Sequence, residues 1–412
     1  MKPGAYTPAH KSPRLAELVC SNSLRSDDPA SGPGLLKAEM RRAGSVVLAA
    51  ADAHRVPAGG ALAVDREKFS KAVEAALAAH PRIAIVRREV REIPDHPRVI
   101  LATGPLTTDA LADSLRARTG EESLHFVDAT APIVAAGSID RAVAFEASRY
   151  GKGDAAYLNC PMTREQYEAF VEALLAAEKV RPREFEEPRF FEGCMPIEEM
   201  ARRGRETLSH GPMKPVGLVD PRTGRRPYAV VQLRPETRFA DLYNLVGFQT
   251  QMTWPEQRRV FRMIPGLANA EFHRLGTLHR NTFVRAPKVL DERLRLRADP
   301  RVRLAGQLSG IEGYIESAAT GWLAGLFAAA EFLGRDLAPP PPECAHGGLI
   351  AHLTKSDPDH FAPMNVTFGL LPPIVPPVHK KQRKEALRER GLAAFEAWWS
   401  GVLAAMPELR EA

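Results

Sequence analysis

The chain has 412 residues, which is long enough for two or three domains. Hydrophobic residues make up 44% of the sequence and charged residues 26%, a balance typical of globular proteins and not of disordered ones. No run approaches the roughly 20 apolar residues that a membrane span needs, and the N-terminal stretch carries charges and prolines where a signal peptide has its apolar core. We therefore expect a cytoplasmic protein. Its four cysteines are too few for a disulfide framework, so each is a candidate thiol.

The first of these thiols, Cys20, lies between an apolar turn and the polar run Ser21–Ser23. Serine and asparagine favour turns and helix caps. With Arg25 close by, such a place favours a reactive thiolate. The alternative is a half-buried free cysteine without chemistry.

Hydrophobic periodicity predicts a mixed succession of helices and strands. Helices are expected over 34–51, 66–80, 109–118, 163–178, 197–204, 256–263, 314–330 and 347–355. Short strands are expected over 62–64, 83–86, 90–92, 99–102, 124–128, 157–160, 228–233, 302–305 and 365–368. Asp65 is predicted to cap one helix, and Thr163 with Gln166 forms a capping-box pattern at another.

Two further features stand out in the first half of the chain. One apolar strand ends in Ala102-Thr103-Gly104, an element typical of flavoproteins with two dinucleotide folds, in which the backbone turns beneath the cofactor. Cys194 lies beside Gly193 and Pro196 at a predicted helix start, a site that stabilises a thiolate. Cys160, by contrast, is expected to be structural.

A glycine-rich segment follows the strand 302–305 and leads into a helix of small residues. Glycines at such a junction let the backbone approach a ligand, because they accept positive φ and have no Cβ. A helix that begins there directs unpaired N–H groups toward the ligand. A tight turn with no ligand is the alternative. The residues concerned are Gly306, Gln307, Gly310, Gly313, Tyr314 and Glu316.

Basic residues cluster in three places, which favours contact with phosphate. A solvated helix face is the alternative, especially for the run 378–390, which carries six Lys or Arg against two Glu. The polar stretch 279–283 is expected to be a loop. Cys344, His346 and His352 have no second half-site at zinc spacing, so no metal is expected. The candidate RNA-binding residues are Arg202, Arg203, Arg225, Arg226, Lys380, Lys381 and Arg383.

Many long segments resemble the folate- and flavin-dependent tRNA (uracil-5-)-methyltransferases, in the order of that family. They include ELVCSNSLRS, FFEGCMPIEEMA, GPMKPVGL, VVQLRPE, YNLVGFQT, HRNTF and AGQLSGIEGYIESAATG. The resemblance runs from about residue 1 to residue 372. It implies an α/β fold with an FAD-binding, Rossmann-like two-dinucleotide-fold domain and an α/β insertion domain.

The resemblance also implies an activity. Members carry FAD, take a one-carbon unit from methylenetetrahydrofolate, use NAD(P)H as reductant, and methylate C5 of the T-loop uridine at position 54 of tRNA. Cys20 and Cys194 would then be the catalytic pair, with their individual roles left open. The segment 307–316 would hold the flavin end of FAD with Tyr314 stacked on the ring, and Thr103 and Gly104 would lie beneath the cofactor. The basic clusters would bind the T-arm of tRNA.

Family members normally begin with a strand, a Gly-x-Gly-x-x-Gly turn, a helix and a second strand, whereas this sequence opens just past them. We interpret the difference as a start codon assigned too late. We expect the full-length form, which carries these elements, to bind FAD. The expected divisions are 1–104 and 211–372 for the FAD-binding domain, 105–210 for the insertion, and 373–412 for a basic helical segment.

Two alternatives remain. One is the related flavoprotein group that modifies the tRNA wobble uridine with the same folate, although the FEGCMP segment argues against it. The other is a flavin-free protein that binds tRNA without chemistry. A yellow purified protein would dismiss the second alternative.

Overall fold

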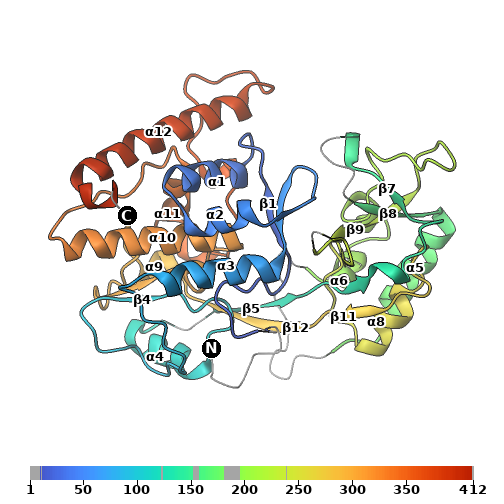
Figure 1. Ribbon diagram of the computed structural model, residues 1–412, viewed down its shortest axis with the longest axis horizontal. Coiled ribbons are helices and arrows are strands. Elements are labelled where there is room, and N and C mark those ends of the chain that lie inside the picture. Colours follow the sequence, from blue (N-terminus) through green and yellow to red (C-terminus); the bar gives the residue numbers. More distant parts are fainter. Residues whose placement is uncertain are drawn as a thin grey trace.

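The structure is a computed structural model with two lobes joined by a pair of long strands (Figure 1). It describes residue 10 and residues 12–121, 124–151, 157–180, 195–237 and 239–410, with only the backbone described at 124–128 and 278–280. The joining strands are β5 (Leu124–Ala129) and β12 (Leu278–Phe283), which pair antiparallel along their whole length.

The first lobe is built from both ends of the described chain and is mainly helical. Its N-terminal elements are β1 (Ser23–Ser26), α1 (Gly32–Arg42), α2 (Val46–Ala53), β2 (Arg55–Val56), β3 (Ala61–Val64), α3 (Arg66–Ala79), β4 (Val99–Leu101) and α4 (Asp109–Thr119). Its later elements are α9 (Ala286–Val289), β13 (Val302–Leu304), α10 (Tyr314–Phe332), α11 (Ala345–Lys355) and α12 (Arg383–Ala405). The strands β1, β3 and β2 form one small sheet, and β13 pairs parallel with β4. This parallel pair positions the start of α10, because β13 runs directly into the glycine-rich turn before that helix.

The second lobe is an antiparallel sheet covered by short helices. Its elements are β6 (Ile133–Ala135), β7 (Phe145–Glu146), β8 (Leu158–Met162), α5 (Arg164–Ala176), α6 (Ile197–Arg202), α7 (Thr207–His210), β9 (Ala229–Pro235), β10 (Leu242–Leu245), α8 (Trp254–Phe261) and β11 (Phe272–Arg274). The strand order is β11-β6-β10-β9-β8-β7. All seven residues of β9 are buried, which fits its place inside this sheet.

Two capping predictions are confirmed. The Asp65 side chain accepts the backbone N–H of Lys68 at the start of α3. Thr163 and Gln166 form the predicted capping box at α5, each side chain bonding the other's backbone N–H. These local signals are reliable because each cap satisfies backbone donors that the helix itself leaves free.

Several predicted elements are wrong. The helix expected over 34–51 is two helices, broken at Gly44 with φ of 71°. Residues 83–86 and 90–92 are not strands, and Ile83 and Val86 are exposed. Part of the first segment lines a cavity described below, which explains its apolar residues without a sheet.

Two further predictions fail in the second half of the chain. The stretch 279–283 belongs to the strand β12 and is not a loop. Its backbone pairs with β5, and polar side chains do not prevent such pairing. The strand expected over 365–368 is absent from the structure as described. There the Val366 N–H donates to the Glu316 carboxylate (3.1 Å) and so is not used in a ladder.

The buried cores divide the chain at positions other than the expected domain limits. Leu111 and Leu115 of α4 pack in the first lobe, whose core resumes at Phe283. The second core runs from Ala131 to Leu267 and Ala270. We therefore propose that the insertion spans about 130 to 273.

The C-terminal helix α12 closes the first lobe over an aromatic cluster. Phe395 is fully buried, and its ring stacks on His346 with centroids 5.2 Å apart. Trp322 of α10 lies 5.3 Å from Trp399 between ring centroids. The apolar side chains of this helix therefore pack into the core, while Lys380 and Lys381 lie in the exposed segment before it.

A buried carboxylate, Glu39 of α1, anchors the start of α11. It accepts the N–H groups of Ala345 (2.7 Å) and His346 (3.0 Å) and bonds His346 Nδ1 (2.7 Å). The Glu39 side chain is fully buried, so no bulk water is available to accept these hydrogen bonds if the carboxylate is removed.

We expect Glu39→Ala to lower the free energy of unfolding by roughly 3–5 kcal/mol, because several buried donors then lose their acceptor. Urea unfolding followed by circular dichroism measures the change. The exposed Glu396, which pairs with Arg42 at the surface, supplies the control variant Glu396→Ala, expected to change stability by less than about 1 kcal/mol. Equal losses in the two variants would contradict the anchoring role.

Candidate active site

Cys20 is the best-placed thiol in the part of the chain that the structure describes. It is half-buried and lies just before β1. Its sulfur is 3.0 Å from the hydroxyl oxygen of Tyr314, and its backbone N–H donates to the same oxygen at 2.8 Å. The two residues are 294 positions apart in sequence, so the tertiary fold creates this pair.

Tyr314 is the first residue of α10 and follows Gly313, which has φ of 103°. A side chain at position 313 would collide with Glu316 and Asn365, so only glycine fits this turn. Desolvation and, secondly, the charge of Cys20 raise the pKa of Tyr314 well above its ordinary value. The phenol therefore stays protonated at neutral pH and can donate its hydrogen to a Cys20 thiolate.

Six of the predicted cofactor residues line one cavity together with Cys20. Its volume is about 450 Å³, within the range of ligand sites. These six residues are Thr103, Gly104, Gly306, Gln307, Gly313 and Tyr314. Gly104 has φ of 74° and no atom within 4 Å of where a Cβ would stand, so the wall is open there. The first turn of α10 borders the same space and contributes its unpaired N–H groups.

The structure does not bring the other two predicted cofactor residues to this cavity wall. Gly310 has φ of 93°, and a Cβ there would lie 2.5 Å from the ring of Phe361, so it serves the turn. Glu316 is fully buried, accepts the N–H of Val366 and pairs with Arg25 at 3.3 Å. Burial raises the pKa of Glu316. Glu316 therefore holds α10 against the neighbouring loops.

Sequence reasoning missed three arginines that hold the segment around Cys20. Arg66 of α3 donates to the carbonyl of Leu18 (2.5 Å), and Arg274 of β11 donates to the carbonyl of Val19 (2.7 Å). Arg234 of β9 donates to Ser21 Oγ (2.8 Å) and Asn22 Oδ1 (2.9 Å).

Two of these arginines come from the second lobe, so both lobes position Cys20. Glu236 fixes the first-lobe arginine in turn, because its carboxylate accepts Arg66 Nε at 2.5 Å. The only sequence signal was that Arg234 lies within the VVQLRPE segment.

A second cavity, of 330 Å³, also reaches Cys20. It is lined mainly by the second lobe and includes Met195. Cys194, the predicted partner of Cys20, lies outside the described residues. The residue that follows it in the chain, however, shares a cavity with Cys20.

The other described cysteines are not placed for chemistry. Burial raises the pKa of Cys160 to about 12. Burial and then the charge of Glu39 raise the pKa of Cys344 well above its ordinary value. Both thiols therefore stay protonated at neutral pH.

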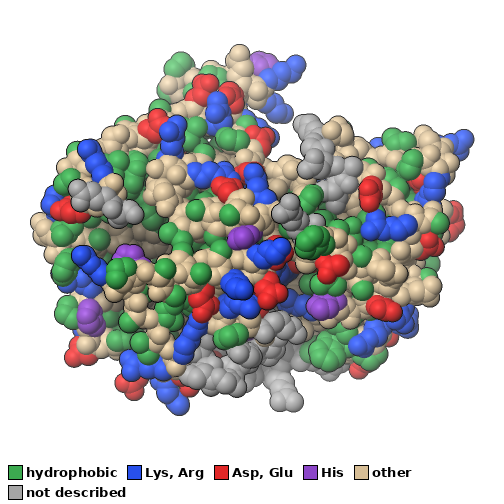
Figure 2. All heavy atoms as spheres, viewed as in Figure 1, with side chains coloured by type: hydrophobic (Ala, Val, Ile, Leu, Met, Phe, Trp, Pro, Cys, Tyr) green, Lys and Arg blue, Asp and Glu red, His purple; other side chains and the backbone are tan. Residues whose placement is uncertain are grey.

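The predicted RNA-binding side chains are all exposed and form two separate groups. Arg202, Arg203, Arg225 and Arg226 belong to the second lobe. Lys380, Lys381 and Arg383 lie at the start of α12 on the first lobe. Figure 2 shows Lys and Arg side chains gathered at the tip where this helix begins, and others spread over the second lobe.

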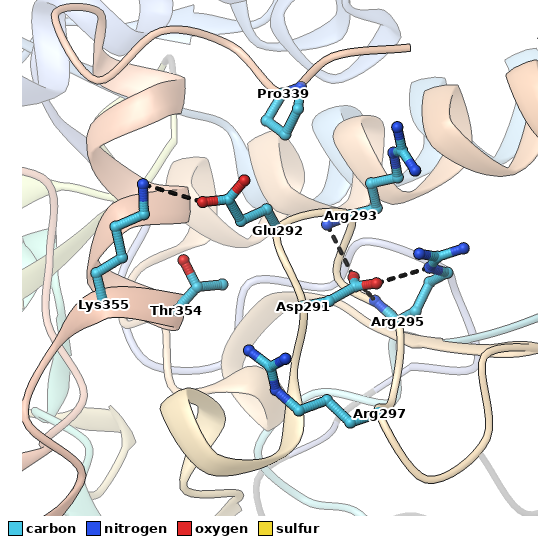
Figure 3. A pocket seen from close by; sticks show the side chains of 8 residues that line it. All are labelled: Asp291, Glu292, Arg293, Arg295, Arg297, Pro339, Thr354 and Lys355. Atoms are coloured by element: carbon cyan, nitrogen blue, oxygen red, sulfur yellow. Dashed lines mark hydrogen bonds and ion pairs between the residues drawn. The ribbon is translucent and has the colours of Figure 1, made fainter. Parts of the chain in front are cut away.

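A separate cavity of 480 Å³ lies between the loop before β13 and the helix α11 (Figure 3). Lys355 pairs there with Glu292 (2.9 Å), and Arg295 pairs with Asp291 (2.7 Å). None of the predicted site residues lines it. Across the described ranges, no cluster of three His, Cys, Asp or Glu side chains could hold a metal ion. No helix among those described is both long and apolar enough to cross a membrane.

Comparison with known proteins first defines the class. A family model described as "Glucose inhibited division protein A" matches residues 5–336. Two crystal forms of Aquifex aeolicus GidA share the fold, with TM-scores of 0.67 and 0.66 at 16% and 15% identity. The matches cover 96% of this chain and 73% and 70% of those chains. The predicted α/β fold class is thereby confirmed.

Within this class, the chain belongs to the methylenetetrahydrofolate--tRNA-(uracil-5-)-methyltransferase (TrmFO) family. A relative from Geobacter sulfurreducens is 60% identical over 98% of this chain and 93% of its own length. Relatives from Desulforudis audaxviator and Paramagnetospirillum magneticum are 57% and 56% identical, over 97% and 98% of this chain and 91% and 92% of their own lengths. The family predicted from the sequence motifs is confirmed.

We expect Tyr314→Phe to slow alkylation of Cys20 by iodoacetamide at pH 7 by about 10-fold, because a hydrogen bond to a charged group is worth roughly 1.5–3 kcal/mol. Loss of the phenolic donor disfavours the thiolate, so the pH of half-maximal rate should move upward. Peptide mass spectrometry isolates the Cys20 signal. Tyr228→Phe, which removes a hydroxyl bonded to Glu206, should leave the profile unchanged. A wild-type profile in Tyr314→Phe would show that the phenol does not stabilise the thiolate.

Proposed function

We propose that this protein forms 5-methyluridine at the T-loop uridine of tRNA, with methylenetetrahydrofolate as carbon donor, FAD as cofactor and NAD(P)H as reductant. The observation that carries the proposal is the position of Cys20. This residue borders both the 450 Å³ cavity and the 330 Å³ cavity, and its sulfur contacts the Tyr314 hydroxyl. Family membership supports the same reaction. We propose a cytoplasmic location, because a tRNA substrate is available there.

The chemistry needs a nucleophile and a base. C5 of uracil is a poor nucleophile until a thiolate adds to C6, and the C5 proton must leave later. Cys20 and Cys194 supply these two groups, and either assignment of roles satisfies the reaction. Met195 on the wall of the 330 Å³ cavity supports a position of its neighbour close to Cys20.

The 450 Å³ cavity fits the flavin end of FAD. Gly104 leaves the wall open for a flat ring, and Gln307 offers an amide that already bonds Glu312 (2.6 Å). The start of α10 adds N–H donors. When bound, FAD supplies the reducing chemistry, and the protein's own residues orient it beside Cys20. Tyr314 is then a hydrogen-bond partner of Cys20, in addition to the stacking role expected from the sequence.

The exposed basic groups are proposed to bind tRNA phosphates. Phosphate contacts supply most of the affinity for nucleic acid and make it depend on salt. The two groups lie on different lobes, so one RNA can contact both while a loop nucleotide reaches the 330 Å³ cavity beside Cys20.

Replacement of either catalytic cysteine tests the function directly. We expect Cys194→Ala and Cys20→Ala each to abolish 5-methyluridine formation in a T-arm RNA, measured by nucleoside mass spectrometry, because one thiolate cannot serve both steps. Cys344→Ala, at a buried protonated thiol, is the control and should stay active. Methylation by the Cys194 variant would refute the catalytic role of Cys194. A colourless protein that only binds tRNA would refute the proposed methyltransferase activity.

Removal of the basic group at α12 tests the RNA interface. We expect the triple change of Lys380, Lys381 and Arg383 to Ala to weaken tRNA binding, and to reduce the slope of log affinity against log salt by about 1 for each lost phosphate contact. The matched control changes the dispersed exposed residues Lys71, Arg116 and Lys355 to Ala. Equal effects in both triples would show that only net charge matters.

A further inference from the structure

The 330 Å³ cavity beside Cys20 is lined by both apolar and polar side chains. Met195, Met200 and Val246 belong to the apolar lining. The polar lining consists of Ser21, Arg234, Asn244 and Gln249. Such a lining suits a flat heterocycle with hydrogen-bonding atoms along one edge.

Asn244 is the informative residue of the polar lining. It lies on β10, directly opposite Arg234 on β9, and its side chain is almost fully buried at 3% exposure. Within the described residues, Asn244 Nδ2 has no hydrogen-bond partner. Buried amide groups are normally satisfied, and an unmet one is unfavourable. An unpartnered donor on a cavity wall therefore points to a ligand.

The surroundings of Asn244 are held in place by independent bonds. The guanidinium of Arg234 is oriented by Asn22 and Ser21, at 2.9 Å and 2.8 Å. The carbonyl of Gln249 accepts the Ile197 N–H at 2.8 Å, which ties this wall to α6. The cavity is thus preformed, and the Asn244 Nδ2 atom is still unpartnered within the described residues.

We propose that this cavity is the subsite for the acceptor pyrimidine, and that the Asn244 amide donates to the O4 carbonyl of uracil. The proposal rests on the function proposed above and assigns the substrate contact within it. A uridine turned out of its stack would place its polar edge against Asn244 and Gln249. The assignment does not depend on which cysteine attacks.

The donor acts where charge develops. As a thiolate sulfur forms its bond to C6, the electron pair of the C5–C6 double bond moves through C4 and negative charge accumulates on O4. No atom leaves in this step, and C5 becomes the nucleophile toward the one-carbon donor. A preorganised amide N–H at O4 stabilises that charge, as donors do in oxyanion holes.

The size of the cavity separates this occupant from a folate. The pocket is smaller than the 450 Å³ cavity, and it lies on the second-lobe side of Cys20. A pyrimidine ring fits such a site, whereas a folate with its glutamate tail is a much longer molecule. Folate binding here is therefore an outcome that the experiment must detect.

The first test is steady-state kinetics of the full chain with a T-arm RNA. We expect Asn244→Ala to lower kcat by about 10²-fold, the range for one lost oxyanion donor, with little change in KM for RNA, which phosphate contacts dominate. Asn244→Asp should lower kcat at least as far, since a carboxylate repels negative charge at O4. The same substitution at the exposed Asn269 of the second lobe, Asn269→Asp, is the matched control and should leave kcat unchanged.

The second test separates binding from a structural role. Asn244→Leu replaces an unpartnered buried amide by an apolar side chain of similar size, so we expect an unchanged or higher melting temperature together with lost activity. A structural asparagine would instead lose stability in this variant.

Three outcomes would overturn the assignment: wild-type kcat in Asn244→Ala, a lower melting temperature in Asn244→Leu, or a raised KM for methylenetetrahydrofolate at unchanged kcat. Failure of the underlying function is distinguishable, because the unmodified protein would then form no 5-methyluridine at all.

Discussion

The contact between Cys20 and Tyr314 is the constraint on which the rest of the site depends. One phenol oxygen lies 2.8 Å from the Cys20 nitrogen and 3.0 Å from its sulfur, so it fixes both the backbone and the thiol. The contact requires the turn before α10 to end at one point beside the segment before β1. The hydrophobic core provides that alignment, because Ile315 of α10 and Leu18 and Leu24 beside Cys20 are buried in the same cluster.

The segment that carries Cys20 has no sheet ladder of its own at residues 18 and 19, so its carbonyls need other donors. Arginine side chains fill that need from both lobes. Burial would penalise these charges if they were unbonded, and Arg66 is accordingly paired with Glu236 as well as with the segment. The position of the thiol is therefore coupled to the packing of the second lobe against the first.

Two buried asparagines on the second-lobe sheet differ in whether their amide nitrogens have hydrogen-bond partners inside the protein. Asn159 of β8 donates to the carbonyls of Phe145, Ala147 and Tyr157, and its own oxygen accepts from Gln232. Both its amide nitrogen and its amide oxygen are partnered inside the protein, as expected for a residue that organises a sheet. Asn244 is equally buried but leaves its amide nitrogen unpartnered beside the reactive thiol. Unmet polarity at a cavity wall distinguishes a recognition residue from a packing residue.

The amino-acid sequence by itself determined the family, the helix caps at Asp65 and Thr163, and the glycine-rich turn before Tyr314, because these depend on neighbouring residues or on long motifs. It could not determine that 279–283 forms a strand, since that strand exists only through its pairing with β5. Nor could it find Arg66 and Arg274, which lie far from Cys20 in the chain and match no local pattern. Only the tertiary structure decided which of the predicted residues share a cavity with Cys20, because burial and hydrogen bonding between distant segments are properties of the packed chain.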